Sequence, residues 1–443
     1  MFYSRRMIRP LCNAAIAWRT TRNNLPAFRR QGLPLLLVLI LAPAASARAD
    51  LDINEAVRLA LADDPVIAAS KARSQAFSDN AIADGQLPDP QLRTGIYNLP
   101  TDNFHINEEP STQLRLGVVQ AFPRGKTLHY KQRQSEWKAT SAMATAELGA
   151  RQVILDVRRS YLELYYQTRA EKIVVETRRL FSQLVDITQA HYATGRVSQQ
   201  DILNASLELA RLDDRTTRIL NAVDTNRATL MKWIGEPAAL PVNSAFPELP
   251  LPAAKAEIQA ALPEHPAIRV ETARLEAENQ SIQIAREQYK PGWSAGLEYR
   301  KRYGEDPDGD DRSDMMAAMV TVDIPLFPKN RQDKRLSASI QQATSVQLTR
   351  DDKLRGLKQQ LDTDYANWQR LGERAVLYES QLLQASTANA QASLNAYQSG
   401  VTEFTTLMRA RITDLDVRLA DLRIRVNRAK ARASLLYLSG EDQ

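Results

Sequence analysis

Four stretches of the chain alternate between apolar and polar residues, which is the period of a β-strand. They cover residues 92–99, 113–122, 293–303 and 315–324. In the third stretch one face carries Trp293, Ala295, Leu297 and Tyr299, and the other carries Ser294, Gly296, Glu298 and Arg300. This pattern is typical of strands that turn an apolar face to lipid and a polar face to a barrel lumen. A small soluble sheet packed on helices would show the same period.

Long helical stretches follow each pair of strands. From Lys126 to Ala193 no proline interrupts the chain, so a continuous helix would be roughly 100 Å long at 1.5 Å per residue. Near the C-terminus, apolar residues recur at alternating spacings of four and three, which is the pattern of a coiled-coil seam. The seam consists of Met408, Ile412, Leu415, Leu419, Leu422, Val426, Ala429, Ala433 and Leu436.

The same order of elements occurs twice. Asp64-Pro65, before an alanine-rich helix, recurs as His265-Pro266 at an offset of 201 residues, and the turn at Gly195 recurs at Gly400 at an offset of 205. The landmarks keep their order, so the sequence predicts a duplicated unit of a short helix, a β-hairpin and two long helices. We expect a first repeat at 50–235, a proline-rich linker at 236–252 and a second repeat at 253–443.

The first 49 residues have the composition of a secretory signal peptide. They contain eight arginines and no acidic residue, and an apolar run of 13 residues, Leu33 to Ala45, precedes small residues suited to cleavage. Without this segment the formal net charge changes from +6 to −2, and the only cysteine, Cys12, is lost with it. The basic character of the whole chain is therefore no argument for nucleic-acid binding.

Four strands are too few to close a barrel, which needs about eight or more. If the strands face lipid, an open sheet edge is not tolerated there, so the subunit must oligomerise. A dimer would supply eight strands and a trimer twelve, and only the wider ring leaves a water-filled path.

The sequence holds little that would support an enzyme or a resident metal. The histidines stand singly at 105, 129, 191 and 265, and no Walker loop or nucleophile motif occurs, so we expect no catalytic residues, no metal site and no cofactor. Met315, Met316 and Met319 are soft-metal ligand types, but strand packing explains them better. The acidic loop at 304–314 lacks the calcium-loop spacing and is expected to be a solvated loop.

Several motifs resemble the TolC-like outer-membrane efflux family. These are the turns Tyr192-Ala-Thr-Gly195 and Tyr397-Gln-Ser-Gly400 between long helices, and Leu-Pro-Asp-Pro-Gln-Leu at 87–92 before the first strand. The segments 85–90, 98–100 and 120–126 are most similar to the heavy-metal branch, the Cus and Czc type. The resemblance covers essentially the whole chain after the leader.

This resemblance implies a mainly α, α+β fold that trimerises. Its twelve-stranded transmembrane β-barrel would continue into a long α-helical barrel in the periplasm. The implied function is passive conduction of substrate, heavy-metal cations, from an inner-membrane RND-type pump and a periplasmic adaptor across the outer membrane. Alternatives are a duct for drug efflux or type I protein secretion, a soluble periplasmic coiled-coil adaptor, and an exported helical enzyme.

The resemblance also implies a periplasmic tip and gate. In relatives with a closed tip, residues at the positions of Asp201 and Tyr397 form a hydrogen bond; the alternative is that Asp201 only caps its helix and Tyr397 only packs. Where some relatives place acidic residues in the lumen, this chain has Thr406 and Arg409. The predicted tip comprises Gly195, Arg196, Val197, Asp201, Tyr397, Gly400, Thr406 and Arg409, and the predicted barrel lumen includes Glu298 and Arg300.

Overall fold

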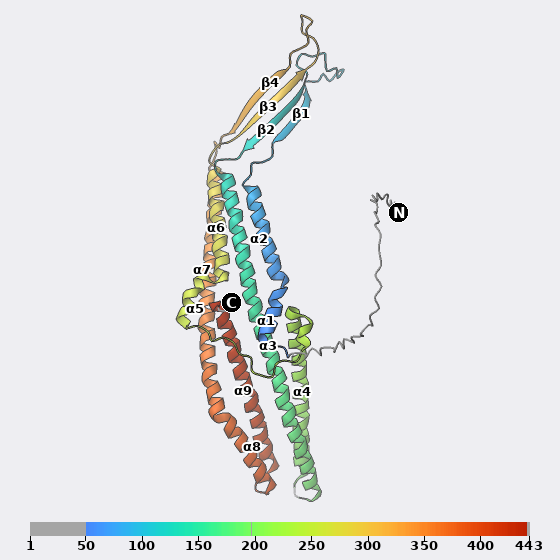
Figure 1. Ribbon diagram of the computed structural model, residues 1–443, viewed down its shortest axis with the longest axis vertical. Coiled ribbons are helices and arrows are strands. Elements are labelled where there is room, and N and C mark those ends of the chain that lie inside the picture. The colour runs from blue at the N-terminus through green and yellow to red at the C-terminus, as the bar shows by residue number, and fades with distance from the viewer. Residues whose placement is uncertain (1–49, 196, 441–443) are drawn as a thin grey trace, which may run out of the picture. The chain divides into compact units, whose positions relative to one another are not determined.

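The computed structural model describes residues 50–195 and 197–440, so the predicted signal peptide and Arg196 lie outside the described residues. The first half comprises α1 (Ile53–Ala62), α2 (Pro65–Asp84), β1 (Gln91–Tyr97), β2 (Gln113–Phe122), α3 (Thr127–Ala193) and α4 (Gln199–Ile234), as Figure 1 shows. The second comprises α5 (Lys255–Ala261), α6 (Pro266–Glu287), β3 (Gly292–Arg302), β4 (Met315–Asp323), α7 (Gln332–Leu377), α8 (Leu383–Gln398) and α9 (Phe404–Ser439). Short η1 (Glu236–Ala239) and η2 (Leu262–Glu264) are 3-10 turns, and η3 (Tyr378–Leu382) is a π-helix. The expected mainly helical fold with a four-stranded sheet is confirmed.

Local chemistry explains where several helices begin. Asp64 accepts hydrogen bonds from the backbone N–H groups of Val66 and Ile67, and Pro65 occupies the first helical position of α2, where its missing N–H costs nothing. His265 and Pro266 occupy the same positions before α6, with the His265 ring accepting from the Ala267 N–H at 3.2 Å.

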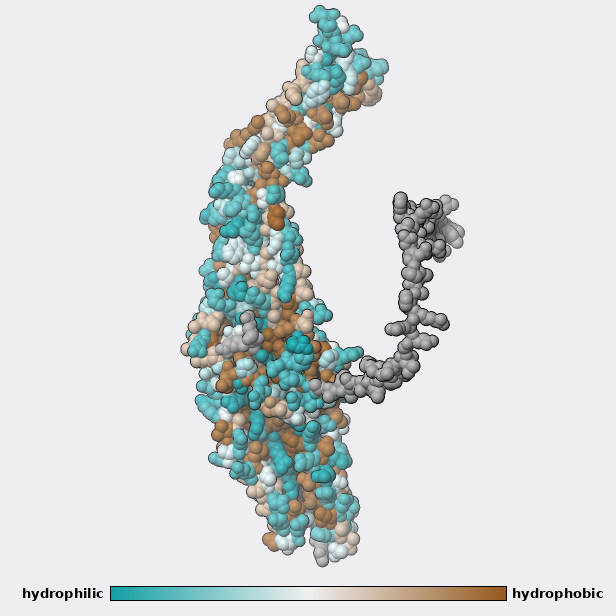
Figure 2. Space-filling model, viewed as in Figure 1, coloured by the Kyte–Doolittle hydropathy of each residue, from teal (hydrophilic) through white to brown (hydrophobic). Residues whose placement is uncertain are grey.

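The four strands form one antiparallel sheet in the order β1-β2-β3-β4. Direct cross-strand partners share a face, so the register assigns each side chain to a side. One face is apolar and exposed, and Figure 2 shows hydrophobic residues gathered over the strands. The exposed large apolar residues of this face are Leu92, Ile96, Leu114, Leu116, Val118, Trp293, Leu297, Tyr299, Met316, Val320 and Val322. The opposite face, the polar face, carries Arg93, Arg115, Glu298, Arg300 and Arg302, together with four glycines.

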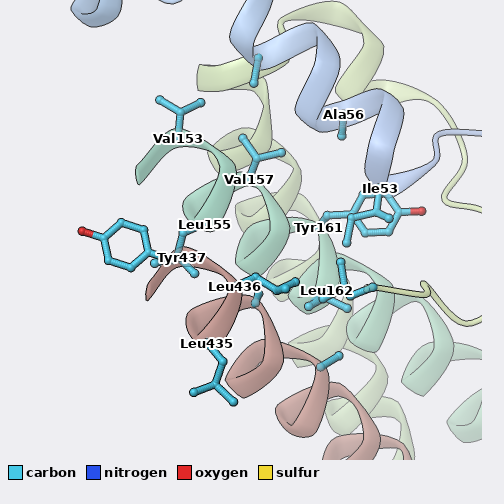
Figure 3. Packing of buried hydrophobic residues seen from close by; sticks show 14 of the residues in the cluster. Ile53, Ala56, Val153, Leu155, Val157, Tyr161, Leu162, Leu435, Leu436 and Tyr437 are labelled. Carbon is cyan, nitrogen blue, oxygen red and sulfur yellow. The ribbon is translucent and has the colours of Figure 1, made fainter. Parts of the chain in front are cut away.

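The main hydrophobic core lies where α1, α3 and α9 meet (Figure 3). Ile53, Val157, Tyr161 and Leu436 are almost fully buried there. The Tyr161 hydroxyl donates to the Leu51 carbonyl at 2.7 Å, and the chain at Leu51 also pairs with the linker at Val242. The core therefore fastens the beginning of the described chain and the linker to the long helices of both halves.

A second core cluster lies further along the helical hairpins. It includes Phe181, Leu212, Phe404, Leu415 and Leu419. Since these residues come from α3, α4 and α9, the two hairpins pack on each other as well as within themselves.

Candidate functional site

The glycines in the two hairpin turns have the same backbone conformation. Gly195 lies in the turn between α3 and α4 and has φ +70°, and Gly400 lies in the turn between α8 and α9 and has φ +71°. Both angles lie in the left-handed region, which a residue with a Cβ adopts only at a cost, so glycine is required at each turn.

The turns border a common cavity of about 800 Å³, here called the tip cavity. Its lining includes Gly195, Val197 and Asp201 from the first turn and Tyr397 and Gly400 from the second. These five predicted tip residues are thus brought together by the fold.

Aromatic rings form one wall of the tip cavity. The Tyr397 ring centroid lies 6.0 Å from that of His191 and 5.6 Å from that of Phe404. Tyr397 is 6% exposed, and its hydroxyl has no hydrogen-bond partner among the described residues.

Asp201 has a local role in this subunit. Its carboxylate accepts from the Ser198 backbone N–H at 3.1 Å and from the Ser198 hydroxyl at 2.9 Å, while the Ser198 hydroxyl accepts from the Asp201 N–H. This reciprocal pair is a capping box at the start of α4. The hydrogen bond between Asp201 and Tyr397 that the family resemblance implies is not formed within the described subunit.

Thr406 and Arg409 do not line the tip cavity. Both are exposed and lie one turn apart on the same face of α9. Arg409 forms no ion pair with the described residues. A lumen role for these two residues therefore depends on how copies of the chain assemble.

Glu298 and Arg300 lie together on the polar face of the sheet, with the Arg300 Nε 2.6 Å from a Glu298 carboxylate oxygen. Arg115 is their cross-strand neighbour, and its guanidinium lies 3.9 Å from the centre of the Tyr97 ring. Arg115 is not among the predicted lumen residues, although the alternation Leu114-Arg-Leu116-Gly-Val118 assigns it to the polar side.

His265, one of the four single histidines, is a structural residue. It is 1% exposed, and because its Nδ1 accepts from Ala267, its Nε2 must donate to the Tyr437 carbonyl at 3.2 Å. Burial, together with the positive charge of Arg151, lowers the pKa of His265 to about 4. Across the described ranges, no three His, Cys, Asp or Glu residues are grouped so as to hold a metal ion.

None of the helices within residues 50–195 and 197–440 has both the length and the apolar composition needed to cross a membrane.

Comparison with known proteins gives a family match and a fold match. The family model described as "Outer membrane efflux protein" matches residues 56–236 and 258–441. No curated protein sequence matches the chain.

Three solved structures illustrate the fold match. The outer-membrane channel OprN shares 17% identity and a TM-score of 0.74, over 88% of this chain and 89% of that one. VceC of Vibrio cholerae shares 17% identity and a TM-score of 0.73, over 87% and 96%. CusC, studied for folding and transmembrane channel formation, shares 17% identity and a TM-score of 0.72, over 94% and 98%.

Proposed function

The chain belongs to the outer membrane efflux protein family, and from this premise we propose that it is the channel subunit of a tripartite efflux system. In this proposal three copies form a duct that passively conducts substrate from an inner-membrane pump of the RND type and a periplasmic adaptor. Heavy metals are the proposed substrate.

Family membership confirms two expectations from the sequence: the resemblance to TolC-like channels, and a location in the outer membrane with the helices on its periplasmic side. The family consists of efflux channels, so we propose a conduit rather than an adaptor or an enzyme.

The observation that carries the proposal is the open sheet. Within the described residues β1 and β4 each pair on one side only, and the sheet exposes a continuous apolar face, with Leu297 61% and Val320 70% exposed. Unpaired strand edges and an apolar face are both unfavourable in water. Joining β1 of one copy to β4 of the next would pair the edges, and lipid would cover the apolar face.

The helices support the same head-to-tail closure. Near the sheet, contacts run in the order α2, α3, α6, α7, and further along in the order α4, α3, α9, α7, so α2 and α4 lie on one edge and α7 and α8 on the other. Both edges expose apolar side chains: Ile82 and Leu203 on the first, Leu348 and Val376 on the second. An interface between two different edges is heterologous, and the closed assembly that such an interface forms is a ring. Membership of the efflux family, whose TolC-like members the sequence resembles, favours three copies.

We assign the tip cavity to the contact with the adaptor and to gating. Gly195, Val197, Asp201, Tyr397 and Gly400 line it, Arg196 lies between them in sequence, and Thr406 and Arg409 follow on α9. Aromatic and capping groups at the end of two long hairpins form a surface that another helical hairpin can contact.

The division of the chain into two repeats, 50–235 and 253–443, with a linker at 236–252, is part of this proposal. Its support is the recurrence of the glycine turns and of the Pro-started helices α2 and α6.

The metal assignment has narrower support. It comes from segments 85–90, 98–100 and 120–126, which are similar to the Cus and Czc type, and CusC is among the similar structures. The runner-up is a duct for drug efflux or type I secretion.

The deciding experiment is growth of a deletion strain on copper, silver, zinc, cobalt and cadmium salts and on organic antibiotics. Selective metal sensitivity, restored by the wild-type gene, is expected. Restoration should fail with Gly400→Val, because a β-branched residue cannot adopt φ +71° without strain. Gly356→Ala in α7, where an added Cβ meets nothing, is the matched control. Sensitivity to antibiotics alone would reject the metal assignment but not the channel.

A further inference from the structure

The charges on the polar face of the sheet are unevenly distributed along the strands. Three successive rows of cross-strand partners nearest the loops hold Arg93, Arg115, Glu298, Arg300 and Arg302, which we call the basic belt. The next rows toward the helices hold no charged residue until Asp323 at the end of β4. The belt therefore concentrates four positive charges against one negative charge.

The belt is electrostatically undercompensated. Arg115 and Arg300 are direct cross-strand partners, an arrangement in which like charges repel. Glu298 lies between them, 2.6 Å from the Arg300 Nε and 3.8 Å from the Arg115 Nε. The side chains of Arg93 and Arg302 form no ion pair with any described residue. The Glu298 carboxylate is thus shared by two guanidinium groups. The guanidinium groups of Arg93 and Arg302 have no acidic partner among the described residues.

The polar face has the crowding expected of the inner side of a curved sheet. All four glycines of the strands lie on it, at positions 95, 117, 292 and 296. A Cβ added at Gly117 would lie 3.1 Å from the Leu297 carbonyl oxygen and 3.3 Å from the Glu298 Cβ. Glycine on one face lets a sheet bend toward that face, so closure should turn the belt inward.

We infer that the basic belt makes the duct selective for anions, so that it passes species bearing carboxylate or oxyanion groups. The inference rests on the proposed function, because the belt faces a water-filled path only if copies close into a barrel with this face inward. Rings of arginine or lysine are the means by which pores select anions. A heavy metal would then leave as an oxyanion or in an anionic complex, and not as a hydrated cation.

The acidic loop at 304–314 opposes the belt but acts from a different place. Asp306, Asp308 and Asp310 lie beyond the strand ends and are exposed to solvent, where salt screens them. The side chains of Arg115 and Arg300 are only 23% and 26% exposed, so their field is screened less. The belt, and not the loop, is therefore assigned the dominant effect on ions within the barrel.

The test is the reversal potential of the purified protein in planar lipid bilayers across a potassium chloride gradient. Wild-type channels should prefer chloride several-fold over potassium. The double variant Arg93→Gln, Arg302→Gln should lose most of this preference. Lys301→Gln is the matched control, since Lys301 lies between these rows on the apolar face, and it should leave the preference unchanged.

A variant that strengthens the preference guards against misfolding as an explanation. Glu298→Gln removes the only acidic residue of the belt and should increase the preference for chloride. Wild-type channels that prefer potassium, or that show no preference, would overturn the inference and leave the channel function intact. Absence of any conductance would overturn the proposed function and the inference with it.

Discussion

The two helical hairpins end in equivalent turns, but their helices differ in continuity. In the first hairpin α3 runs without interruption over 67 residues to the turn at Gly195. In the second, the corresponding stretch is divided by the π-helix η3 at Tyr378–Leu382, and α8 begins after it. The second hairpin therefore has a local feature that the first lacks. A π-turn inside an α-helix often marks a functional position.

The contacts across the hairpins differ as well. In the second hairpin the Asp414 carboxylate accepts hydrogen bonds from the Ser386 and Thr387 hydroxyls, each at 2.9 Å. At the offset of 205 residues that relates the turns, Phe181 corresponds to Ser386 and Leu209 to Asp414, and these two belong to an apolar cluster. Apolar contact tolerates sliding, whereas hydrogen bonds to one carboxylate are either made or lost. The duplicated topology therefore combines a hairpin held here by apolar packing with one held here by directional hydrogen bonds.

The largest effect on stability is expected where the two repeats of one chain are joined. Glu163 of α3 is bonded by Arg423, at 2.8 and 3.0 Å, and by Lys430, both of α9. Glu163→Gln leaves two half-buried cations without their partner, so it should destabilise the fold by about 3 kcal/mol. The measurement is the midpoint temperature of helix loss, followed by circular dichroism in detergent.

The acid dependence of the same contact provides a second readout. Burial opposes the charge of Glu163, but Arg423 and Lys430 outweigh it and lower its pKa from 4.5 to about 2. A carboxylate with a lowered folded pKa stabilises fully above its unfolded pKa and loses this contribution as pH falls toward the folded value. Wild type should thus lose stability between pH 4.5 and 2, and Glu163→Gln should lose less. Equal losses would show that the joint is not this ion cluster.

The helix start at His265 should respond to pH. Burial of His265 lowers its pKa to about 4 from 6.5, so the unfolded state binds more protons in this interval. The contribution of neutral His265 to the free energy of unfolding is fully present above pH 6.5, and it falls by on the order of 2 kcal/mol as the pH drops toward 4. His265→Asn keeps an acceptor at the helix start and should remove this dependence. An unchanged pH profile in the variant would contradict the assignment.

Replacing the chemistry of one hairpin by that of the other tests the comparison directly. Asp414→Leu removes the carboxylate that accepts from the Ser386 and Thr387 hydroxyls and pairs with Arg418, so it should cost about 2 kcal/mol. Adding Ser386→Phe recreates the apolar pair of the first hairpin and should recover part of this loss. Asp416→Ala, an exposed acid on the same helix, is the control and should change stability by less than about 1 kcal/mol. Strictly additive effects of Asp414→Leu and Ser386→Phe would show that the two positions do not interact.

The sequence predicts what depends on local pattern. The absence of proline predicts a helix from Lys126 to Ala193, and α3 covers Thr127–Ala193. The glycines of the two turns were identifiable because helices end there, and both have the positive φ that this role requires. Strand period separated Glu298 and Arg300 from Leu297 and Tyr299, as the register shows.

Features that depend on register between distant segments were not predictable. Asp414 meets Ser386 only because α8 and α9 pack in one particular alignment, and Arg115 meets Glu298 only through the pairing of β2 with β3. The π-helix at Tyr378–Leu382 has no signature in the pattern of apolar residues. The family resemblance paired Asp201 with Tyr397, whereas within the subunit the carboxylate bonds Ser198, three residues away, which is its nearest donor.

The smallest effect on stability is expected at the tyrosines that precede the turns. Tyr397 is buried in the wall of the tip cavity, where no described residue bonds its hydroxyl, whereas its counterpart Tyr192 is 46% exposed. Tyr397→Phe removes a hydroxyl that makes no hydrogen bond with the described residues, so stability should change by less than about 0.5 kcal/mol. If the hydroxyl serves the proposed gate, through a bond formed only in the assembled closed tip, the variant should open more often in planar bilayers. Tyr192→Phe should behave as wild type in both measurements. Unchanged opening of Tyr397→Phe would restrict Tyr397 to packing against His191 and Phe404, and the gate would then have to lie elsewhere at the tip.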